Sequence, residues 1–137
     1  MIIIGDQFRR NVFRNTPGMY ATDDKVLSWA KSCLSGAKSL PLCMRMWVYL
    51  PFMHSERLED QNTCVESLED LVKEVTTLEN GEGSSESQFA TNMLGYAKRH
   101  QVIVEKYGRF PHRNAILGRT NTDQEDIGLR DGTIESF

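Results

Sequence analysis

Apolar residues recur at every third or fourth position along most of this chain, a spacing that gathers side chains on one face of an α-helix. The pattern runs through residues 24–34, 41–53, 58–78 and 89–107. Gly36 and Gly108 follow two of these segments, where glycine commonly ends a helix. Met1–Ile4 is rich in β-branched residues, which favour a strand, but nothing later in the chain supplies a partner strand. We therefore predict an all-α fold of antiparallel helical hairpins, whose first helix ends near Phe13.

Proline and capping residues refine the ends of the first helices. Thr22 or Asp23 is suited to cap the helix that follows it. Pro41 is expected at the first position of the next helix, because proline is favoured there. Pro51 removes a helical hydrogen bond and predicts a kink or break near Leu50.

Further signals mark the helices of the second half. Residues 80–87 are rich in glycine and serine, and we predict a flexible loop there. Ser85 with Gln88, and Thr122 with Glu125, each have the spacing of a capping box. The second of these boxes predicts a short last helix.

The length of 137 residues fits one domain, which ends in a polar tail over 129–137. No apolar run is long enough to cross a membrane, and Met1–Ile4 is too short for an export signal. Cys33, Cys43 and Cys64 form no CxxC pair and lie at no metal-ligand spacing from a histidine. We expect buried, reduced thiols, a cytoplasmic location, and no metal or cofactor.

The net charge of −3 is unevenly distributed along the chain. Counting Lys and Arg against Asp and Glu gives +4 for residues 1–57, −8 for 58–91, +5 for 92–120 and −4 for 121–137. A general nucleic-acid binder would usually be basic overall, so we do not expect nucleic-acid binding. The two basic segments could instead combine into a local site for a small anion.

Four polar and aromatic clusters interrupt the helical pattern and contain all three histidines of the chain. They read DQFRRN at residues 6–11, YLPFMHSE at 49–56, YAKRH at 96–100, and YGRFPHRN at 107–114 with LGR at 117–119. In this order the clusters resemble the motifs of the uncharacterised family known as domain of unknown function 924. The resemblance extends from about Ile2 to Glu125, nearly the whole chain.

The resemblance implies a helical fold similar to a right-handed stack of tetratricopeptide repeats, and no established reaction. Gly5 and Arg9 depart from the family pattern, which usually has an aliphatic residue and a proline there. Members of the family usually have further helices before the first motif. We therefore expect this chain to correspond to the C-terminal two-thirds of the family domain. Apolar side chains left exposed are then expected at Ile2, Ile3, Ile4, Phe8, Val12 and Phe13, with self-association through the first four.

The first two clusters contain candidates for both structural and ligand contacts. Asp6 with Arg10, and Gln7 with Asn11, lie four residues apart and share a helical face, so the first pair is expected to form an ion pair. His54 and Glu56 are two residues apart and point away from each other on a helix. Both turn toward one cleft only if Pro51 breaks the helix; otherwise they make structural hydrogen bonds. His100, on the apolar face of its helix, is expected to be a hydrogen-bonded core residue.

The last cluster is the strongest candidate for ligand binding. Arg109 and Arg113 suit the recognition of carboxylate or phosphate, and His112 between them could bind an anion or transfer a proton. The alternative is that the two arginines pair with Asp6, Glu56 or helix carbonyls and tie the helices together. A metal site of His54, Glu56 and His112 lacks any characteristic spacing and is disfavoured.

Three functional hypotheses follow. The first is a binding domain whose polar groove holds an anionic small molecule or a group on a protein partner. The second is a hydrolase- or transferase-like enzyme with His54 or His112 as general base and Arg109 and Arg113 as an anion clamp. The third is a structural domain in which the motifs form a buried tie. The candidate site residues are Asp6, Gln7, Arg10, Asn11, His54, Glu56, Arg109, His112, Arg113 and Asn114.

Overall fold

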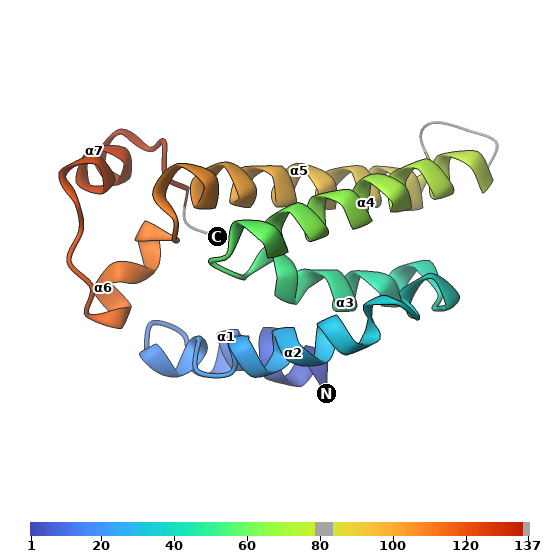
Figure 1. Cartoon of the computed structure of the whole chain (residues 1–137), viewed down its shortest axis with the longest axis horizontal. Coiled ribbons are helices and arrows are strands. Elements are labelled where there is room, and N and C mark those ends of the chain that lie inside the picture. Colours follow the sequence, from blue (N-terminus) through green and yellow to red (C-terminus); the bar gives the residue numbers. More distant parts are fainter. Residues whose placement is uncertain (79–83, 136–137) are drawn as a thin grey trace.

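The computed structural model describes residues 1–78 and 84–135, which fold into helices without any strand (Figure 1). The long helices are α2 (Asp23–Leu34), α3 (Leu42–Met53), α4 (Leu58–Leu78) and α5 (Ser85–Tyr107). The shorter ones are α1 (Arg9–Val12), α6 (Asn114–Leu117) and α7 (Asp123–Asp131). Single helical turns cover Ile4–Phe8 (η1), Pro17–Met19 (η2), Ala37–Ser39 (η3) and Pro111–Arg113 (η4). The predicted all-α fold is confirmed.

Helices α2 to α5 each pack against the next one in the chain, and their apolar faces form the main core. Phe52 of α3, Leu68 and Val75 of α4 and Ala97 of α5 are buried there. Figure 1 shows α1 beside α2 on one side of the stack, and α6 and α7 together beyond the C-terminal end of α5. The similarity to tetratricopeptide repeats stays a prediction.

Helix α3 differs from the prediction at both ends. Pro41 is the N-cap, one position before the first helical residue. Pro51 does not break the helix near Leu50, because α3 continues to Met53 and His54 N–H still bonds the Leu50 carbonyl at 3.1 Å. A proline in the last turn removes a single hydrogen bond, which the packing of α3 against α2 and α4 tolerates.

The start of α5 also lies earlier than predicted. Ser84 is its N-cap and accepts a hydrogen bond from Ser87 N–H at 3.1 Å, so the expected capping box at Ser85 and Gln88 is wrong. Of the predicted loop over 80–87, Ser85–Ser87 belong to α5, and residues 80–83 lie outside the described residues. At the other end Gly108 terminates the helix in the left-handed conformation, as predicted.

The C-terminal segment forms a capped helix and contributes one buried side chain. The capping box of Thr122 and Glu125 is confirmed at the start of α7, which extends through Asp131. Ile134 then returns to the protein and is buried in a small second core with Ile103 and Phe110. Of the polar tail predicted over 129–137, residues 129–131 thus belong to α7, and Ile134 attaches the segment that follows.

The exposure of the apolar side chains near the N-terminus follows the prediction except at one residue. Ile3, Ile4, Phe8, Val12 and Phe13 are exposed as expected, with Phe8 64% exposed. Only Ile2 contradicts the expectation, because it packs against the main core.

The cysteine prediction is wrong for two residues. Cys64 is buried in the main core, but Cys33 and Cys43 are exposed.

Across residues 1–78 and 84–135, no helix has the length and apolar character needed to cross a membrane.

Candidate functional site

A pocket of about 590 Å³ opens where the N-terminal turns approach the end of α3, the middle of α5 and the segment η4–α6. Its described lining contains three arginines and all three histidines of the chain, together with amide side chains, and no carboxylate. The lining residues are Gln7, Arg10, Asn11, Arg14, Asn15, Met19, Tyr20, His54, His100, His112, Arg113 and Ile116. The two basic segments of the sequence thus meet at one pocket.

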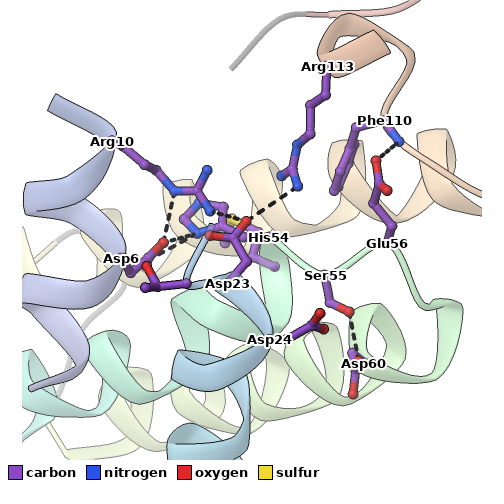
Figure 2. Close-up of polar contacts among 12 residues, drawn as sticks. Asp6, Arg10, Asp23, Asp24, His54, Ser55, Glu56, Asp60, Phe110 and Arg113 are labelled. Carbon is purple, nitrogen blue, oxygen red and sulfur yellow. Dashed lines mark hydrogen bonds and ion pairs between the residues drawn. The ribbon is translucent and has the colours of Figure 1, made fainter. Parts of the chain in front are cut away.

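Asp6 is not part of this lining but contacts three residues of it (Figure 2). Its side chain is buried and accepts hydrogen bonds from Arg10 Nε at 2.8 Å and from Gln7 at 3.0 Å. The Nδ1 atom of His54 lies 2.9 Å from Asp6 Oδ1. Burial alone would raise the pKa of the Asp6 carboxyl, but the bond to His54 and the Arg10 guanidinium hold it well below its usual range. Asp6 is therefore ionised at neutral pH and fixes both neighbours.

Asp23 extends this network to the last polar cluster. It accepts a hydrogen bond from Arg10 Nη2 at 2.9 Å and lies 3.5 Å from Arg113 Nη1. Figure 2 shows Arg10 and Arg113 reaching toward this carboxylate from opposite sides. Burial raises the pKa of Asp23, although the two guanidiniums oppose the rise. The predicted pair of Asp6 and Arg10 is confirmed, and it is one part of a longer chain of charges.

Arg113 is held in place by aromatic rings rather than by a full set of hydrogen bonds. Its guanidinium lies 4.7 Å from the Tyr20 ring centroid and 4.3 Å from that of Phe110, and the residue is only 6% exposed. Its buried Nε has no hydrogen-bond partner within the described chain. Burial and the nearby Arg10 lower the pKa of Arg113 to about 10, so it remains charged at neutral pH. The Nε–H group of Arg113 is therefore a donor available to a bound molecule.

The three histidines are neutral at pH 7. Burial is the main cause in each case: it lowers the pKa of His100 to about 3 and that of His112 to about 4, and it outweighs Asp6 in lowering the pKa of His54. His100 also bonds the Tyr96 carbonyl at 2.8 Å, as expected for a core histidine. The positive charge of the pocket therefore comes from its arginines.

These lowered pKa values predict loss of stability in mild acid. Each unfolded imidazole takes up a proton near pH 6.5, whereas the folded one resists until a lower pH, so folding becomes less favourable as the pH falls below 6.5. His100 alone should lower the free energy of unfolding by about 2 kcal/mol between pH 7 and pH 5. Urea unfolding across this range tests the loss. The His100→Phe variant should show a shallower pH dependence, and an equal slope in both proteins would contradict this assignment.

Three predicted site residues lie in a different network that attaches the C-terminal segment. Glu56 accepts Phe110 N–H at 2.8 Å and two bonds from Arg119. Arg109 donates two bonds to Glu125, at 2.6 and 2.7 Å. Asn114 donates to Asn121 at 2.7 Å. Glu56, Arg109 and Asn114 are absent from the lining of this pocket and act as a tie. The partner of Arg109 is Glu125 rather than the predicted Asp6, Glu56 or helix carbonyls.

Sequence reasoning missed several participants in both networks. Asp23 and Tyr20 contact the pocket arginines, and Arg119 and Glu125 complete the tie. The sequence predicts Asp23 only as a helix cap. The excess of arginine and lysine over acidic residues in 1–57 could have indicated that its carboxylate pairs with an arginine. Tyr20 lies outside every motif and gave none.

The geometry offers no arrangement for a metal ion among the described His, Cys, Asp and Glu residues. His54 faces His100 with ring centroids 6.2 Å apart, and Phe110 stands between His100 and His112, 5.5 Å from each. Glu56 turns away toward Arg119. The histidines therefore line a wall side by side rather than converging on one point.

Comparison with known proteins supports the resemblance seen in the motifs. The model of a family described as a bacterial protein of unknown function, DUF924, matches residues 1–133. A solved structure of a protein of unknown function from Agrobacterium tumefaciens is 33% identical and superposes with a TM-score of 0.76. The alignment covers 96% of the present chain and 65% of that one, and no curated protein matches. The chain belongs to the bacterial family DUF924.

Proposed function

We propose that the pocket binds a small molecule through a carboxylate or phosphate group. The observation that carries this proposal is Arg113, a buried guanidinium whose Nε has no hydrogen-bond partner in the described structure and which lines the pocket beside Arg10. A buried donor without a partner is costly, and an anion would satisfy it with a charge-assisted bond. The pocket volume of about 590 Å³ suits a small ligand.

The charge of the pocket supports an anion rather than a cation. Arg10, Arg14 and Arg113 line it, while the two nearby carboxylates, Asp6 and Asp23, are outside its lining and neutralise only part of that charge; Asp23 lines an adjoining hollow. Arg14 and the side-chain amides of Asn11 and Asn15 supply further donors at the rim. The separate tie at Glu56 and Arg109 explains how the C-terminal segment is attached without using these groups.

Binding of inorganic phosphate tests this proposal. Calorimetric titration at low ionic strength should give saturable binding to the unmodified protein. Arg113→Gln should weaken the affinity by about tenfold or more, because it removes a desolvated charged donor. Arg130→Gln, an equal change of charge at an exposed position of α7, should leave the affinity within about twofold.

Two results would contradict the proposal. One is the absence of saturable binding by phosphate and by small carboxylates such as acetate and citrate. The other is an equal loss of affinity in Arg113→Gln and Arg130→Gln, which would mean that phosphate binds through net charge rather than at the pocket.

The exposed N-terminal side chains support a second, separate proposal, that two copies of this chain associate. Ile3, Ile4 and Phe8 are exposed to solvent, and Ile4 and Phe8 line one shallow hollow with Val12 and Phe13. Sedimentation velocity over increasing concentration should show association, and the double variant Ile4→Glu, Phe8→Glu should abolish it. A monomer at all concentrations would contradict the proposal.

We also propose a cytoplasmic location, because the three cysteines are free thiols and a reducing compartment keeps them so.

A further inference from the structure

We propose that His54 is a general base for the molecule held in the pocket, with Asp6 as its positioning residue. The substrate class is a small acid in which a proton on oxygen or carbon lies next to the carboxylate or phosphate group. This inference rests on the proposed anion site and adds a reaction to it.

The orientation of His54 is fixed by Asp6. Nδ1 of His54 lies 2.9 and 3.1 Å from the two carboxylate oxygens of Asp6. An ionised carboxylate can only accept a hydrogen bond, so Nδ1 carries the proton of the neutral ring. The other ring nitrogen, Nε2, is then unprotonated and has a lone pair. Asp6 is itself held by Arg10 and Gln7, which restrains the ring further.

The Nε2 atom is positioned for chemistry rather than for structure. His54 is the C-cap residue of α3 and lines the pocket, and both hydrogen bonds of its side chain to described groups pass through Nδ1. The lone pair of Nε2 therefore stays available, and a proton taken up there can be stabilised through Nδ1 by the Asp6 carboxylate. The other carboxylate of the network, Asp23, bonds Arg10.

The pocket wall narrows the reaction class. Among the described lining residues there is no serine, threonine, cysteine or lysine, so covalent catalysis by those side chains has no nucleophile there. Arg10 and Arg113 lie on the same wall as His54 and would hold the anionic group of the substrate. The proton leaves the substrate for Nε2, its electron pair stays on the substrate atom, and the guanidiniums stabilise the negative charge that develops. The protonated Nε2 then gives the proton to a neighbouring atom of the same molecule, so one bond to hydrogen breaks, another forms, and the net reaction is an isomerisation that needs no further reactant.

Alkylation by bromoacetate tests this assignment without knowledge of the natural substrate. The reagent has a carboxylate for the arginines and a carbon that an imidazole lone pair attacks with loss of bromide. After acid hydrolysis of the histidine peptides, chromatography separates the Nδ1 and Nε2 products. We expect modification of His54 at Nε2, about tenfold or more faster than by neutral bromoacetamide, because a site of positive charge concentrates anions. Inorganic phosphate should protect His54, and Asp6→Asn should slow its modification by about tenfold.

The outcomes separate this inference from the proposed function. If phosphate binds but bromoacetate modifies Nδ1, or modifies His112 in preference to His54, the anion site stands and the general-base assignment is overturned. If His54 reacts equally with bromoacetate and bromoacetamide and phosphate gives no protection, the anion site itself fails. Peptide mapping keeps reaction at the exposed Cys33 and Cys43 apart from both readouts.

Discussion

Phe110→Ala is expected to lower the free energy of unfolding by about 3–5 kcal/mol, the largest effect of any substitution near the pocket. Phe110 is fully buried, and its ring contacts the rings of His100 and His112 and the guanidinium of Arg113. It also joins Ile134 in the small second core. Its removal leaves a cavity beneath η4 and releases one side of Arg113.

Urea unfolding measures this loss, and Phe89→Ala provides a matched control. Phe89 lies half-exposed on α5, so truncation there should cost less than about 1 kcal/mol. Phe110→Leu should fall between the two. An equal effect of Phe110→Ala and Phe89→Ala would mean that the ring does not hold the C-terminal segment against α5.

Asp6→Ala is expected to destabilise the protein by about 3 kcal/mol. The substitution removes a buried carboxylate that accepts from Arg10, His54 and Gln7 and leaves the Arg10 guanidinium with Asp23 as its remaining partner. The guanidinium is largely buried, so water compensates little of the loss. Phosphate binding should persist or strengthen in the folded variant, because one negative charge near the pocket is gone.

Asp24→Ala is the control for this prediction. Asp24 is highly exposed and pairs with Arg57 at the surface, so its removal should change the free energy of unfolding by less than about 0.5 kcal/mol. Comparable effects of Asp6→Ala and Asp24→Ala in urea unfolding would show that the buried network adds no more to the free energy of unfolding than a surface ion pair does. Loss of phosphate binding in a folded Asp6→Ala protein would contradict the charge argument.

The features predicted correctly from the sequence are those decided by residues close together in the chain. The period of apolar residues gave the bounds of α4, Gly108 gave the end of α5, and the spacing of Asp6 and Arg10 gave their ion pair. Each of these features is decided within one or two helical turns. The same logic erred at Pro51, because tertiary packing carried α3 past the proline.

Long-range pairing could not be predicted in this way. Arg109 and Arg113 have the same chemistry and stand four residues apart, yet one bonds Glu125 in the tie and the other lines the pocket. The difference arises from the turn η4 between them, which redirects the chain after Phe110. The residue types of the pocket could be predicted from the sequence, and the fold determines which of them line it.

The Nε–H resonance of Arg113 in a ¹H–¹⁵N spectrum provides the most direct test of the anion site. Its Nε is buried and has no hydrogen-bond partner in the described structure, so a bound anion should shift this resonance in a saturable way as inorganic phosphate is added. The exposed Arg130 should show no saturable shift. We expect the same binding constant for phosphate from the Arg113 resonance and from calorimetry. An Arg113 resonance that stays in place while phosphate binds elsewhere would contradict it.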